Sequence, residues 1–88
     1  MMSSENRNGG EVTTISAAQC RAARAMLQWS QAELARAAGL TRHTVADFER
    51  DGRATSRGSV ASIVEALEGS GIVFVAGERG SGEGVRLR

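Results

Sequence analysis

The chain has 88 residues, of which eleven are arginine and none is lysine, and a formal net charge of +1 at neutral pH. A chain of this length forms one domain with one core. It buries only about 60% of the surface that its unfolded form exposes, so dimerisation often adds stability to such domains. A net charge this small does not by itself mark a nucleic-acid-binding protein, so any such function must depend on where the charges are placed.

The single cysteine, Cys20, excludes an intramolecular disulfide and a cysteine-based metal cage, and it favours an intracellular protein. No apolar run approaches the roughly 20 residues that span a bilayer, and the N-terminus lacks the apolar stretch of a signal peptide. We therefore expect a cytoplasmic protein that does not contact a membrane. Residues 1–15 are interpreted as a mobile, polar N-terminal tail, or alternatively as an arm that touches a partner.

The first predicted helix begins after Ser16 and ends near Gln28. In "SAAQ", the Ser16 side chain can accept a hydrogen bond from the backbone N–H of Gln19, while the Gln19 side chain reaches back. The spacing i, i+3, i+7 then places three apolar residues on one face of the helix: Cys20, Ala23 and Leu27.

The second predicted helix is short, roughly Gln31–Ala38. It follows a second capping box, "SQAE", formed by Ser30 and Glu33. Gly39 can end this helix in the left-handed conformation without a Cβ clash, and Leu40 supplies the usual apolar contact beyond it.

A third helix is predicted from Arg42 to about Arg50, with Thr41 as its N-cap and Gly52 as its stop. Val45 and Phe48 are its expected buried pair. Two short helices joined by a three- or four-residue turn that contains glycine are typical of a helix-turn-helix.

A fourth helix and a β-hairpin are predicted after this motif. "SVASIVEALEGSG" carries one apolar stripe and ends at Gly69 and Gly71. The members of the stripe are Val60, Ile63, Val64 and Leu67. The hairpin is indicated by the apolar run "IVFVA", the glycine-rich "GERGSGEG" and the alternating "VRLR".

An isolated two-stranded hairpin is marginally stable in water, so this hairpin must pack against another part of the protein or a second chain. We expect it to pair or pack with the same segment of a second chain in a two-fold symmetric dimer. The alternative is that it folds back on the fourth helix of its own chain. The predicted dimer interface consists of Ile72, Val73, Phe74, Val75, Val85 and Leu87.

The stretch "LQWSQAELARAAGLTRHTVADFER" resembles the helix-turn-helix of the Xre, or lambda-repressor-like, family of DNA-binding regulators. The resemblance extends from about Ser16 to Leu67. The residues that carry it are Ser30-Gln31, Glu33-Leu34-Ala35, Gly39, Thr41, Val45 and Phe48-Glu49. It implies an all-α, lambda-repressor-like bundle of about four helices, with the DNA-binding domain over residues 16–70 and the C-terminal β-hairpin over residues 71–88.

The resemblance also implies roles for particular residues. Arg24 and Glu49 match a largely buried ion pair that ties the first helix to the third; the alternative is two solvated surface charges. Gln31, at a helix N-terminus that favours anions, matches a contact to the DNA backbone. The full set of predicted phosphate contacts is Gln31, Thr41, Arg50, Arg53 and Arg57, of which the last two are placed in a loop after the third helix.

Base reading is expected from the outward face of the third helix, through Arg42, His43, Thr44 and Asp47. Arginine is the most frequent partner of guanine, and a carboxylate can accept from cytosine. Asp47 is the ambiguous member, because phosphates repel it unless Arg42, Arg50 or His43 pairs with it.

Together these features predict a dimeric, sequence-specific DNA-binding regulator of transcription that places the helix Arg42–Arg50 in the major groove of a pseudo-palindromic site. The alternative is an antitoxin or adaptor that binds a protein partner through the hairpin. We expect no cofactor and no catalysis, because one histidine and two aspartates do not make a catalytic set, and "GSGEG" is followed by no lysine.

Overall fold

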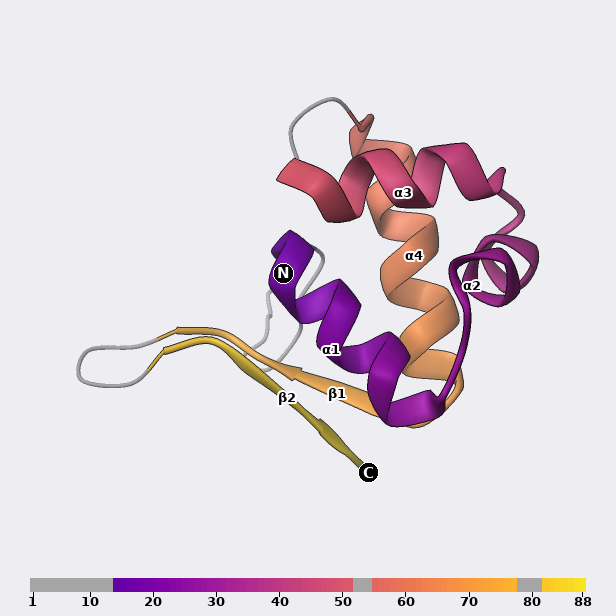
Figure 1. The fold of residues 1–88 in the computed structure, drawn as a ribbon. Coiled ribbons are helices and arrows are strands. Elements are labelled where there is room, and N and C mark those ends of the chain that lie inside the picture. Colours follow the sequence, from indigo (N-terminus) through magenta and orange to yellow (C-terminus); the bar gives the residue numbers. More distant parts are fainter. Residues whose placement is uncertain (1–13, 52–54, 78–81) are drawn as a thin grey trace, which may run out of the picture.

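The computed structural model describes residues 14–51, 55–77 and 82–88. Within them the elements follow in chain order: α1 (Ala17–Leu27), α2 (Gln31–Ala38), α3 (Arg42–Asp51), α4 (Arg57–Gly69), β1 (Ile72–Val75) and β2 (Gly84–Leu87). The helices form one bundle, and the hairpin of β1 and β2 projects from the side of the bundle remote from α3 (Figure 1). The predicted fold class, a helix-turn-helix bundle with a C-terminal hairpin, is confirmed.

Both predicted capping boxes are present. Ser16 Oγ accepts from the Gln19 N–H at 3.1 Å, and Gln19 Oε1 accepts from the Ser16 N–H at 2.9 Å. Ser30 and Glu33 make the equivalent pair of bonds at 3.0 and 2.7 Å. These bonds satisfy N–H groups that have no partner inside the helix, so they fix where α1 and α2 begin.

Left-handed residues end the first two helices. Gln28 closes α1 with φ of 59°, and Gly39 closes α2 with φ of 70°. The chain then restarts at once, because Thr41 Oγ1 accepts from the Thr44 N–H at 3.2 Å and caps α3. The tight turn between α2 and α3 is therefore built by one helix stop and one helix start.

The core lies between the four helices and the inner face of the hairpin. The expected buried pair of α3, the apolar stripe of α4 and two of the three apolar positions of α1 belong to it, and Leu27 is partly buried against it. The core consists of Ile15, Cys20, Ala23, Leu34, Ala35, Val45, Phe48, Val60, Ile63, Val64, Leu67, Ile72 and Phe74.

The two strands pair antiparallel, with Ile72 opposite Leu87 and Val75 opposite Gly84. β1 packs on α4 and β2 packs on α1, so the hairpin covers the bundle of its own chain. Gln19, itself 5% exposed, reinforces this contact because its Nε2 donates to the carbonyls of Val75 at 3.2 Å and Gly84 at 3.0 Å.

Two predicted boundaries are wrong. Ile15, assigned to the tail, is 5% exposed and belongs to the core, so the folded part begins before Ser16. Arg57, assigned to a loop, is the first residue of α4, because Ser56 caps that helix by accepting from the Ser59 N–H. Most of the predicted tail, together with Gly52 and Arg53, lies outside the described residues.

Candidate nucleic-acid interface

Helix α3 has an inward apolar face and an outward polar face. Val45 and Phe48 are buried in the core, while Arg42 and His43 project into solvent from the first turn. The predicted base-contacting residues all lie on this outward part: Arg42 and His43 are exposed, and Thr44 and Asp47 are half-buried. One helix therefore presents several hydrogen-bonding side chains that are not packed in the core.

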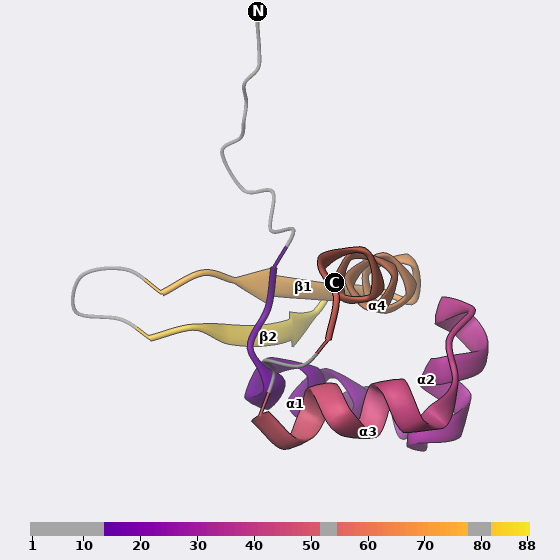
Figure 2. The ribbon, with the colours of Figure 1, turned by 90° about the horizontal axis from the view of Figure 1, so that it is seen from above.

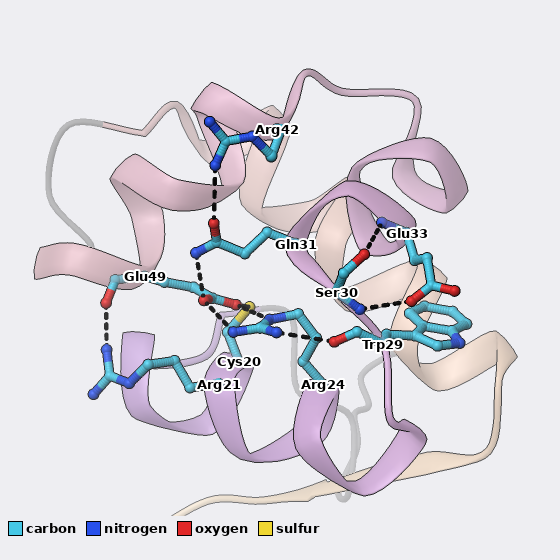
Figure 3. Close-up of polar contacts among 9 residues, drawn as sticks. All are labelled: Cys20, Arg21, Arg24, Trp29, Ser30, Gln31, Glu33, Arg42 and Glu49. Atoms are coloured by element: carbon cyan, nitrogen blue, oxygen red, sulfur yellow. Dashed lines mark hydrogen bonds and ion pairs between the residues drawn. The ribbon is translucent and has the colours of Figure 1, made fainter.

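Arg24 and Glu49 form the ion pair that ties α1 to α3 (Figure 3). Arg24 Nε lies 2.8 Å from Glu49 Oε2, and Arg24 Nη2 lies 2.9 Å from Glu49 Oε1. The Arg24 side chain is 21% exposed and that of Glu49 3%, so neither is a solvated surface charge. Arg24 Nη1 also donates to the Trp29 carbonyl at 2.9 Å, which holds the segment between α1 and α2.

Glu49 has further partners that sequence reasoning missed. Gln31 Nε2 donates to Glu49 Oε1 at 3.1 Å, and the Cys20 thiol donates to Glu49 Oε2 at 3.2 Å. Arg21 adds a hydrogen bond to the backbone carbonyl of Glu49. A signal for the thiol was available, because Cys20 lies one helical turn before Arg24 and therefore on the same face of α1.

This network keeps Glu49 ionised despite its burial. Burial acts to raise the pKa of the Glu49 carboxyl, but hydrogen bonds from Arg24, Gln31 and Cys20 outweigh it and leave the pKa below its ordinary value. Burial, followed by the bond to Glu49, raises the pKa of the Cys20 thiol, so the thiol stays protonated and donates. The bond to Glu49 raises the pKa of Arg24.

Gln31 connects the buried network to the outward face of α3. While its Nε2 donates to Glu49, its Oε1 accepts from Arg42 Nη1 at 3.3 Å (Figure 3). The side chain expected to contact phosphate is thus engaged within the protein. The N–H groups in the first turn of α2 have no intrahelical acceptor, and of these the Glu33 N–H is taken by Ser30.

Asp47 contacts two basic side chains on its own helix. Its Oδ1 lies 2.8 Å from Arg50 Nη2, and its Oδ2 lies 3.3 Å from His43 Nε2. Of the three partners that the sequence left open, the structure brings Arg50 and His43 to this carboxylate. The side chains of His43 and Arg50 are 85% and 69% exposed, so both remain accessible to a ligand.

The other predicted site residues are distributed over two further regions. Arg57 is exposed at the N-terminus of α4, and Arg53 lies outside the described residues. In the hairpin, Ile72 and Phe74 are buried in the chain's own bundle, whereas Val75 is 40% and Leu87 51% exposed. Val73 and Val85 are half-buried.

No group of side chains able to hold a metal ion occurs among the described residues, and no helix within them is long and apolar enough to cross a membrane.

Two short helices, α2 and α3, meet at a glycine-closed turn, and the second presents a polar outward face; this arrangement defines a helix-turn-helix DNA-binding domain. The family model described as Helix-turn-helix, of the Xre and lambda-repressor-like type, matches residues 21–72. The chain belongs to this family and is a DNA-binding helix-turn-helix regulator, as its sequence predicts. A search among curated proteins found no match.

Proposed function

We propose that the chain acts as a dimer on a pseudo-palindromic DNA site, in the cytoplasm, by binding rather than by catalysis. Each subunit lays α3 in the major groove, and the two-fold symmetry of the dimer matches that of the site. The observation that carries this proposal is the outward face of α3, where exposed Arg42 and His43 stand at the helix start beside a turn fixed by Gly39 and Thr41.

Within this proposal, Arg42, His43, Thr44 and Asp47 read base edges. Arg42 is the strongest candidate, because a guanidinium can donate twice to guanine O6 and N7. Asp47 contributes a carboxylate that forms an ion pair with Arg50 and lies beside His43, and the charge of Arg50 reduces its repulsion from phosphates.

Phosphates are contacted by residues around α3, and these contacts position the helix without reading sequence. They are Gln31, Thr41, Arg50, Arg53 and Arg57. For Gln31 the backbone N–H at the α2 N-terminus is the available donor, since the side chain bonds Glu49 and Arg42.

Selection of bound sequences from random duplex DNA tests the proposal directly. The expected result is an enriched motif with two inverted half-sites whose centres lie about one helical turn, roughly 34 Å, apart. Enrichment of a single, non-repeated half-site would contradict dimeric binding, and no enrichment over the starting pool would contradict sequence-specific reading.

A second candidate function is an antitoxin or adaptor that binds another protein through the hairpin. It is favoured by the outer face of β1, where Val73 is half-buried and Val75 is exposed and both side chains are apolar. Sedimentation of the purified chain separates the two functions: a stable homodimer supports the regulator, whereas a monomer or an aggregating species supports a missing protein partner.

A further inference from the structure

We propose that the dimer is built edge to edge, with β1 of one chain pairing antiparallel with β1 of a second copy to give one continuous four-stranded sheet. This inference rests on the proposed function, because it specifies how the dimer forms. It also narrows the predicted interface, since the side chains of Ile72 and Phe74 are already buried in their own bundle.

Among the described residues, β2 is the only strand that pairs with β1, so the opposite edge of β1 is open to a further strand. The Arg88 N–H donates to the Gly71 carbonyl at 2.7 Å, which makes Gly71 and Arg88 a hydrogen-bonded pair at the end of the ladder. Because such pairs alternate along an antiparallel ladder, the N–H and C=O groups of Ile72 and Phe74 point away from β2. Figure 2 shows β2 on one side of β1; on the other side α4 lies beside only one end of the strand, and the segment that leads into α1 passes across it.

The side chains of β1 make this edge suited to a second copy of itself. All four residues from Ile72 to Val75 are apolar, and the strand carries neither charge nor proline, the features by which proteins usually block edge pairing. The edge of β2 is different. α1 packs on that strand, and Arg86 would face the partner's Arg86 if two β2 edges paired about that residue.

The outward N–H and C=O groups of Ile72 and Phe74 also set the register between the two copies of β1. Centring the pair on Val73 places Ile72 opposite the partner's Phe74 and allows both free residues of each chain to hydrogen bond. Val73 then faces the partner's Val73 in a non-hydrogen-bonded pair, where the Cα atoms are about 4.5 Å apart. Val75 lies opposite the partner's Gly71.

The orientation of the bundle agrees with this arrangement. Figure 2 looks down onto the sheet, and Figure 1 shows α3 on the opposite side of the bundle from the hairpin. A dyad that runs through the β1 edge along the sheet normal leaves both α3 helices on the same side of the dimer, where one duplex can meet both. Stacking two hairpins through their outer faces would instead direct the two α3 helices to opposite sides.

Single-cysteine cross-linking tests the edge and its register. Cys20 is fully buried, and burial raises the pKa of its thiol. It should therefore not form disulfides that compete with those of an introduced cysteine. Three variants are compared in the full-length chain: Val73→Cys, Val75→Cys and Arg86→Cys. Circular dichroism of each reduced variant checks that the fold is retained.

Under mild oxidation we expect Val73→Cys to form a covalent dimer in most chains, because a Cα separation of about 4.5 Å suits a disulfide. Val75→Cys should give at least tenfold less dimer, because its partner copy lies four residues away, about 13 Å along the strand. Arg86→Cys should also give background cross-linking.

Three outcomes would contradict dimerisation through the β1 edge. Dominant cross-linking of Arg86→Cys would indicate pairing through β2, and equal cross-linking at 73 and 75 would indicate face stacking. A sedimenting dimer without cross-linking in any variant would place the interface elsewhere, while dimeric DNA binding itself would stand. A chain that sediments as a monomer and protects one half-site would instead refute the proposed dimer.

Discussion

Glu49 joins three helices, because it lies on α3 and its carboxylate accepts from Arg24 on α1 and Gln31 on α2. We predict that Glu49→Gln lowers the free energy of unfolding by about 3 kcal/mol, since it leaves the Arg24 guanidinium without a counter-charge in a largely buried site. The midpoint of urea denaturation, at unchanged slope, measures this loss.

A double-mutant cycle provides the control. Arg24→Gln should cost a similar amount, and the double variant should cost clearly less than the sum, because the unpaired charge is then absent. Additive losses would mean that the two side chains stabilise the fold independently.

The Glu49 carboxylate should also make the stability of the fold depend on pH in the acid range. The pKa of Glu49 is lowered by folding, so its contribution is fully present above its ordinary value of 4.5 and is lost as the pH falls through that value and below. The wild type should therefore lose stability between about pH 5 and pH 3 more steeply than Glu49→Gln. Thermal midpoints measured over this range test it, and parallel curves would contradict the assignment.

In the proposed function, Arg42 is the residue at which base reading can be separated from phosphate binding. We predict that Arg42→Ala costs about 1 to 3 kcal/mol on the selected site and relaxes the preference at one base step. Arg57→Ala should weaken binding to selected and random duplexes by similar factors. Titrations of both DNAs with both variants provide the comparison, and equal losses for Arg42→Ala on the two DNAs would argue against base reading.

The ends of α1 and α2 differ in the residue that occupies the left-handed position. Gly39 has φ of 70° and Gln28 has φ of 59°, so only Gln28 carries a Cβ in a strained conformation. We predict that Gln28→Gly stabilises the fold by about 0.5 to 1 kcal/mol and that Gly39→Ala destabilises it by about 1 kcal/mol.

A Cβ added at Gly39 meets no atom within 4 Å, so the destabilisation expected for Gly39→Ala comes from conformational strain alone. Chemical denaturation of both variants measures the two effects. A stable Gly39→Ala variant would show that the turn adjusts without cost.

Elements whose signals are local could be predicted well. The capping boxes at Ser16 and Ser30 and the stop at Gly39 depend on neighbouring residues, and all three are present. Contacts between distant segments could not be predicted in this way. The bonds from Gln19 to the strand carbonyls and from Cys20 to Glu49 depend on how α1 crosses the hairpin and α3, which no short pattern encodes.

Positive charge is concentrated around the helix-turn-helix motif. Residues 21–57 contain seven arginines and four acidic residues, a net +3, within a chain of net +1. Each subunit can therefore neutralise only a few phosphates, and in the proposed dimer two subunits release counterions together.

The salt dependence of DNA binding should differ between a dimer and a single subunit. The slope of log K against log salt is about −0.9 per neutralised phosphate on duplex DNA, so a dimer should show about twice the slope of a single subunit. Val73→Lys and Val73→Glu each place like charges face to face at the proposed dyad and should both yield monomers with about half the wild-type slope. Val73→Thr, which keeps the β-branched shape, should retain the full slope.

Lysine and glutamate change the net charge in opposite directions. Equal slopes for Val73→Lys and Val73→Glu would therefore show that the reduced slope comes from separating the subunits. Slopes that shift in opposite directions would show that only the added charge matters.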